Sequence, residues 1–128
     1  MGGYESAEEM ERVIARWLRL IGEDRAVSEG CEGYDVSVEF EIEDLDLFFY
    51  THFDDGSFRG GMGEFPGECM VELCMSSEVF DGMFSGELDA TTAAMSGDLA
   101  FAGDVSAAMG LQSLQEDLNR LYRIARAE

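Results

Sequence analysis

The apolar residues near the N-terminus repeat with the period of a helix. They stand three or four positions apart and share one face of a predicted helix: Met10, Val13, Ile14, Trp17, Leu18 and Ile21. Ser6 and Glu9 have the spacing of a capping box, and Gly22 is a helix end signal. Three arginines at positions 12, 16 and 19 fall on the opposite face. A solvated basic face is the simpler interpretation, and a docking face is the alternative.

Strict alternation of residue types next predicts strands. Over residues 36–43, Val38, Phe40 and Ile42 point inward while the glutamates between them point to water. Residues 45–53 are apolar on both faces, so a helix of this chain or a partner is expected to cover the second face. A hairpin turn at residues 54–56 leads to a weaker, glycine-containing strand over residues 57–65.

The C-terminal half mixes strands with helices. Residues 69–75 predict a fourth strand with one shared face: Cys69, Val71, Leu73 and Met75. A helix over residues 76–84 and a short helix follow. The fifth strand has Leu99 and Phe101 inward, with alanines outward. Asp104 is the predicted N-cap of the last helix, in which Gly110 permits a bend.

One segment of this half is the most informative about the family. It contains a Ser-x-x-Phe helix, a Gly-x-Leu turn at residues 86–88, and the run Gly97-Asp98-Leu99-Ala100-Phe101-Ala102-Gly103-Asp104. This order resembles the sterol carrier protein 2 family, closely in the C-terminal half and in the order of elements elsewhere. The resemblance implies an α/β (α+β) fold, with a five-stranded, mostly antiparallel sheet and helices packed on one face around an apolar cavity. It further implies a free-standing, single lipid-binding domain over residues 1–128.

The resemblance also implies which residues contact the lipid. In that family the corresponding elements wall the cavity, so the expected lipid-binding residues are Phe80, Met83, Phe84, Leu88, Met95, Phe101, Met109, Leu111 and Leu114. For any one of them, an ordinary core position is the simpler interpretation. The eight methionines favour the interpretation as lipid contacts, because methionine adapts to varied apolar shapes.

The charge of the chain is unevenly distributed. There are 28 acidic residues against eight arginines, for a net charge of −20. Residues 27–119 hold 21 of the acids and one cation, Arg59, whereas the flanking segments are balanced. This acidic central segment repels phosphate backbones, so nucleic acid is excluded as a partner. A solvated acidic surface is the simpler interpretation. Adaptation to a salty cytoplasm is the alternative, and the balanced flanks weaken it.

The residues that support catalysis or metal binding are sparse. His52 is the single histidine, and it stands in the middle of a predicted strand. The three cysteines form no C-x-x-C motif, so a zinc knuckle or a redox pair is not supported. We therefore expect no enzyme activity, no catalytic residue, no cofactor and no metal.

Two hypotheses of function follow. The first is a cytoplasmic protein that binds a fatty acyl, isoprenoid or sterol-like lipid in an internal cavity, as a carrier or to present it. The alternative is a non-catalytic interaction subunit whose cavity is filled by its own side chains. No apolar run is long enough to span a membrane, and no secretory signal is visible. The outward positions Phe48, Tyr50, Met70, Cys74, Ala100 and Ala102 are apolar. They predict a homodimer or docking to a larger protein.

Overall fold

The protein is built on one mixed five-stranded sheet. The computed structural model describes residues 4–127, apart from the side chain at position 108. The strands are β1 (Asp35–Ile42), β2 (Leu47–Asp54), β3 (Ser57–Met62), β4 (Val71–Met75) and β5 (Leu99–Gly103). Their order across the sheet is β3-β2-β1-β4-β5. Only the β1–β4 pair is parallel, so the predicted, mostly antiparallel arrangement is confirmed.

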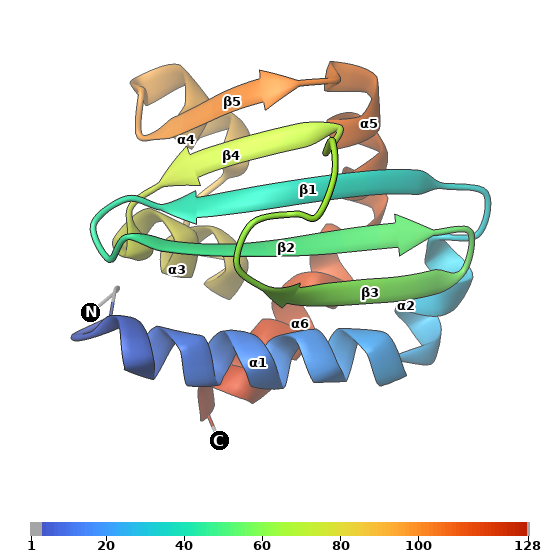
Figure 1. Ribbon diagram of the computed structural model, residues 1–128, viewed down its shortest axis with the longest axis horizontal. Coiled ribbons are helices and arrows are strands. Elements are labelled where there is room, and N and C mark those ends of the chain that lie inside the picture. Colours follow the sequence, from blue (N-terminus) through green and yellow to red (C-terminus); the bar gives the residue numbers. More distant parts are fainter. Residues whose placement is uncertain (1–3, 128) are drawn as a thin grey trace.

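The helices gather on one face of this sheet (Figure 1). They are α1 (Ala7–Glu23), α2 (Arg25–Gly30), α3 (Ser77–Ser85), α4 (Ala90–Ser96), α5 (Val105–Gly110), the 3-10 turn η1 (Leu111–Leu114) and α6 (Gln115–Ala127). The connection from β3 to β4 crosses the opposite face, in front of the sheet in Figure 1. Among the described residues, none of the helices has the length and apolar character that crossing a membrane requires.

Local capping sets the helix boundaries much as the sequence predicts. Ser6 caps α1, since its Oγ accepts the Glu9 N–H at 3.2 Å. Asp104 accepts the Ala107 N–H at 3.2 Å and so starts α5. The single last helix predicted from the sequence is divided into α5, η1 and α6, and Gly110 lies at the first junction, where a bend was expected.

Gly103 explains one glycine of the Gly-Asp-Leu-x-Phe-x-Gly-Asp run. It ends β5 with a φ of 115°, a conformation that side-chain-bearing residues rarely adopt. A Cβ at this position would also collide with the Met70 carbonyl oxygen. That carbonyl accepts the Asp104 N–H at 2.9 Å, which holds the start of α5 against β4. The glycine therefore permits the tight passage from the edge strand into the last helical segment.

The core is an aromatic cluster between the sheet and the helices. Trp17 of α1 packs edge-on against Phe80, with ring centroids 5.7 Å apart, and against Tyr122, at 5.6 Å. Phe40 and Phe49 stack at 4.5 Å on neighbouring strands. The indole N–H of Trp17 donates to the Leu118 carbonyl at 3.0 Å, so the buried polar atom has a partner. The helices are thereby fixed to the sheet around one centre.

The connection over residues 63–70 corrects two predictions. The third strand ends at Met62 because Gly63 has positive φ and turns the chain across the outer face. Phe65 then lies edge-on against Tyr50 at 5.3 Å, and its N–H donates to Glu39 Oε2 at 2.9 Å. The predicted cover of the second strand's outer face is therefore this connection, and neither a helix nor a partner is needed there.

Cys69 is a further correction. Pairing with β1 begins only at Val71, so the inward alternation predicted for residues 69–75 does not reach residue 69. The Cys69 thiol lies instead on the outer face, where its sulfur and carboxylate oxygens of Glu39 and Glu72 are all within 4.8 Å of one another. Local alternation was misleading because residue 69 belongs to the crossing connection and not to the sheet.

A buried polar network ties the chain ends to α3. The Tyr122 hydroxyl donates to Asp81 Oδ1 at 2.6 Å, and Arg126 Nε donates to the same oxygen at 3.0 Å. Since Tyr122 uses its proton in this way, the Tyr4 hydroxyl donates to the Tyr122 oxygen. The Arg126 guanidinium lies 4.1 Å above the centre of the Tyr4 ring. Burial raises the pKa of Tyr4 to about 12, and burial together with Asp81 raises that of Tyr122.

We expect Tyr122→Phe to lower the free energy of unfolding by about 1–3 kcal/mol, because Asp81 loses a donor in a buried site. The raised tyrosine pKa values also predict a pH dependence. Unfolded tyrosine ionises near pH 10, below the folded value, so wild-type stability is complete below about pH 10 and falls as the pH rises towards 12. Urea unfolding across this range measures both effects. An alkaline loss of stability that is equally steep in Tyr122→Phe would contradict the assignment.

Candidate functional site

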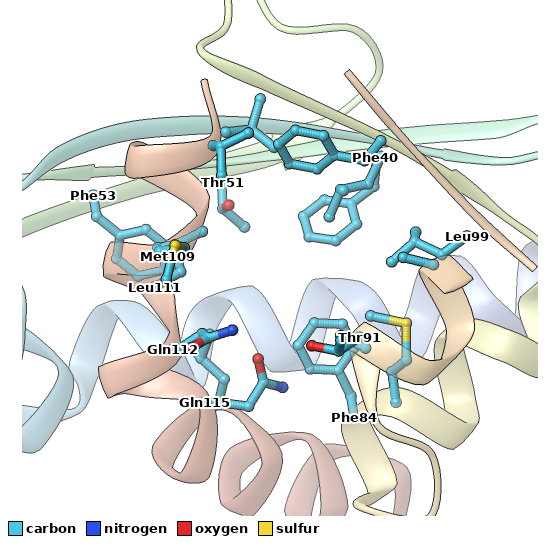
Figure 2. A pocket seen from close by; sticks show the side chains of 18 of the residues that line it. Phe40, Thr51, Phe53, Phe84, Thr91, Leu99, Met109, Leu111, Gln112 and Gln115 are labelled. Carbon is cyan, nitrogen blue, oxygen red and sulfur yellow. The ribbon is translucent and has the colours of Figure 1, made fainter. Parts of the chain in front are cut away.

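A cavity of about 400 Å³ lies between the sheet and the helices. The sheet contributes Phe40, Thr51, Phe53, Val71, Leu73, Leu99 and Phe101. The helices contribute Trp17, Ile21, Met83, Phe84, Ala90, Thr91, Ala94, Val105, Met109, Leu111, Gln112, Gln115 and Leu118. Figure 2 shows the side chains of most of these residues around a common space. The volume is in the usual range for small-molecule pockets, and none of the lining residues is charged.

The strands position one wall by their register. Phe40 of β1 is paired with Leu73 of β4, which is paired with Phe101 of β5, so the three side chains form a row across the sheet. Each occupies an inward position of an alternating strand, as the sequence predicts for all three. The row leads from the edge strand β5 towards β2, and the cavity follows the same direction.

The two ends of the cavity differ in exposure. Trp17 and Phe53, both 1% exposed, and Thr51, at 3%, form the inner end under β2. Val105 and Met109 of α5 are each 61% exposed and form a rim near β5, opposite residues of α4. A ligand can therefore enter between α4 and α5 and reach an inner end that is shielded from water.

Of the nine residues predicted to contact a lipid, five line this cavity: Met83, Phe84, Phe101, Met109 and Leu111. Their presence in the lining agrees with the assignment, and their contact with a ligand stays a prediction. They come from α3, β5, α5 and η1, the segment that carries the resemblance.

The other four predicted residues lie outside the lining. Phe80 is fully buried in the aromatic core, and Leu114 is 1% exposed and packs towards Gly30 of α2. Leu88 packs on Gly82, on another side of α3. Met95 is 84% exposed, because α4 turns Ala90, Thr91 and Ala94 towards the cavity. An apolar residue type did not reveal the face on which each short helix would present it.

Sequence reasoning missed most of the inner end. Trp17, Ile21 and Phe53 were expected to be ordinary core residues, although their inward positions were predicted. Thr51 carried a usable signal, since it is a polar residue at an inward strand position between Phe49 and Phe53. Gln112 offered none, because it lies in the 3-10 turn η1, whose tighter winding shifts the faces expected for one continuous α-helix.

The polar side chains that could take part in catalysis or metal binding lie on the outer face, away from this cavity. His52 Nε2 is 2.8 Å from Asp35 Oδ1, and Arg59 donates to its Nδ1 at 3.4 Å. The Cys69 thiol has a pKa raised by burial and by the nearby Glu39 and Glu72 carboxylates. Because cysteine binds metals as a thiolate, this shift works against metal binding by that cluster.

Comparison with protein families identifies the fold. The model of the SCP-2 sterol transfer family matches residues 14–116, which is most of the chain and includes nearly every element around the cavity. The chain belongs to the SCP-2 sterol transfer family. Family and fold together support a role in lipid binding or transfer. A comparison with curated proteins finds no match.

Solved structures agree at the level of the fold. Sterol carrier protein 2 is 18% identical to this chain, with a TM-score of 0.68. The match covers 88% of this chain and 95% of that protein. Sterol carrier protein domain 2 of Helicoverpa armigera is 16% identical with a TM-score of 0.67, covering 91% and 96%. The inverting sec-alkylsulfatase Pisa1 from Pseudomonas is 18% identical, with a TM-score of 0.59 over 73% of this chain. The chain spans only 14% of the length of that sulfatase.

Proposed function

We propose that the protein binds a hydrophobic lipid in this cavity and acts as a carrier or presents the lipid to another protein. The observation that carries the proposal is an apolar cavity of about 400 Å³ with no charged residue in its lining. A chain or ring that leaves water for such a space gains about 25 cal/mol per Å² of apolar surface buried. Met83 and Met109 line the space and can adapt to ligands of different shape.

The exposed rim supports exchange of the ligand. Phe101, Val105 and Met109 are 39%, 61% and 61% exposed around the outer end of the cavity. An apolar ligand that leaves a membrane or an enzyme meets apolar side chains before it reaches the interior. The rim therefore lowers the cost of the passage through water.

Native mass spectrometry of freshly purified protein, together with a panel of acyl, isoprenoid and sterol probes, tests the proposal. We expect a co-purifying lipid mass, or saturable binding of at least one probe with micromolar affinity or tighter. Trp17 lines the cavity and is the single tryptophan of the chain, so its fluorescence reports binding directly. Protein without lipid and without saturable binding would favour the alternative, an interaction subunit.

We propose further that this role is non-catalytic and that the protein works in the cytoplasm, where free thiols such as Cys31, Cys69 and Cys74 persist. His52→Ala, Cys69→Ser and Cys74→Ser are expected to change lipid affinity less than twofold, since all three side chains lie outside the cavity lining. Fluorescence titration of the variants measures this. A turnover activity of the wild type that disappears in one of them would contradict the non-catalytic proposal.

We also propose self-association as a homodimer, or docking to a larger protein. Met70 is 37% exposed, and Ala100 and Ala102 are exposed beside it on the outer face. Two copies of this acidic protein repel each other least where the contact includes the arginine-bearing terminal helices. Sedimentation should therefore show association that strengthens with moderate salt and weakens when Arg12 and Arg19 are reversed to glutamate. A monomer at every salt concentration, together with no effect of the charge reversal on sedimentation, would refute the homodimer. A complex with a larger protein would then be sought.

A further inference from the structure

Thr51 is a polar residue in the cavity lining, and its hydroxyl has no partner within the described part of the chain. The residue is 3% exposed and lies at the inner end of the cavity. Figure 2 shows its oxygen pointing into the cavity. Its hydroxyl makes no side-chain hydrogen bond to any other part of the chain that the structure describes. No buried side-chain oxygen or nitrogen of the described residues lacks a partner, so the Thr51 oxygen is open to the cavity space and pairs there with water or with a bound ligand.

Two amides face Thr51 from the helical side. Gln112 of η1 and Gln115 of α6 both line the cavity and point into it in Figure 2. The Gln115 Nε2 donates to Asn119 Oδ1 at 2.8 Å, which leaves Gln115 Oε1 as the acceptor on the cavity side. The site therefore presents a hydroxyl that donates or accepts and an amide oxygen that only accepts. A ligand hydroxyl can pair with either group, because it donates one hydrogen bond and accepts another.

A lipid anion fits this site poorly. None of the eight arginines lines the cavity, and neither does His52. A carboxylate taken into the apolar interior would lose its water without gaining a counter-charge. It has no proton to donate to Gln115 Oε1. The chain also carries a net charge of −20, which repels an anion on approach.

We propose that the cavity selects an uncharged lipid with a hydroxyl group over a lipid anion, and that Thr51 binds this hydroxyl at the inner end. The inference rests on the proposed lipid-binding function and narrows its ligand to one chemical class. Apolar side chains give the affinity for the hydrocarbon, and the polar end of the cavity gives the selection.

Three probes that share one hydrocarbon chain test the selection: hexadecanol, hexadecanoate at neutral pH, and hexadecane. Binding is followed by the fluorescence of Trp17, which lines the cavity. We expect hexadecanol to bind at least about tenfold more tightly than hexadecanoate, and more tightly than hexadecane. Equal affinity for all three probes would overturn this inference and leave the proposed function intact. If none of the three binds, the inference fails; the proposed function fails as well only if native mass spectrometry and the acyl, isoprenoid and sterol probes also find no ligand.

Thr51→Val tests the role of the hydroxyl, because valine keeps the shape and the strand preference of threonine. It should weaken hexadecanol binding about fivefold to tenfold and leave hexadecane binding unchanged. Thr92→Val is the matched control, since Thr92 is exposed on α4 and lies outside the cavity lining. We expect that control to change hexadecanol affinity less than twofold. An equal effect of the two variants, or none from Thr51→Val, would overturn the assignment of Thr51.

Discussion

Phe101→Asp is expected to abolish lipid binding, whereas Met95→Asp is expected to leave it intact. Both residues were predicted from the sequence to contact the lipid, and both variants introduce the same carboxylate. Phe101 lines the cavity, but Met95 is 84% exposed and lies outside the lining. A carboxylate beside the apolar space must either lose water when the lipid enters or keep the lipid out. We expect a loss of affinity of at least about 100-fold, equivalent to roughly 2.7 kcal/mol.

Titration of hexadecanol against Trp17 fluorescence measures this difference. Phe101 is 39% exposed on the edge strand β5, so its aspartate can reach water in the unliganded protein and the fold should survive. Thermal unfolding of both variants checks that point. If Phe101→Asp binds lipid as the wild type does while remaining folded, the ligand does not occupy this cavity.

Phe80→Ala is expected to lower the free energy of unfolding by about 3–5 kcal/mol, the usual cost of removing a large core aromatic. Phe80 is fully buried, and its ring lies 5.7 Å from Trp17, 5.5 Å from Phe49 and 4.8 Å from Phe84. The ring therefore joins α3 to α1 and to the sheet, and its removal leaves a void that these neighbours cannot fill without moving.

Urea unfolding gives the stability, with a lower midpoint and an unchanged slope expected. Met95→Ala is the control, and because its side chain is exposed it should change stability by no more than about 0.5 kcal/mol. Phe80 was a predicted lipid contact that lies outside the cavity lining. A Phe80→Ala protein of unchanged stability that has lost lipid binding would show that the sequence-based assignment was right and the core assignment wrong.

The sequence by itself determined the elements whose signals are local. The helical repeat with its Ser6 cap specifies α1, and strict alternation specifies β1, because both depend on residues within a few positions of one another. The run from Gly97 to Asp104 carried the resemblance to the family, and Gly103 within it meets a steric condition that only glycine satisfies. The predicted bend at Gly110 was local too.

Only the tertiary structure decided which apolar residues border an empty space. Phe80 and Phe84 belong to the same helix and are both buried, yet one fills the core and the other lines the cavity. The outer cover by Phe65 and the position of Thr51 in the cavity lining likewise depend on segments that are distant in the sequence. The physical reason is that a residue type reports whether a side chain avoids water. A cavity forms where the distances between packed elements leave a volume unfilled, and no local pattern encodes those distances.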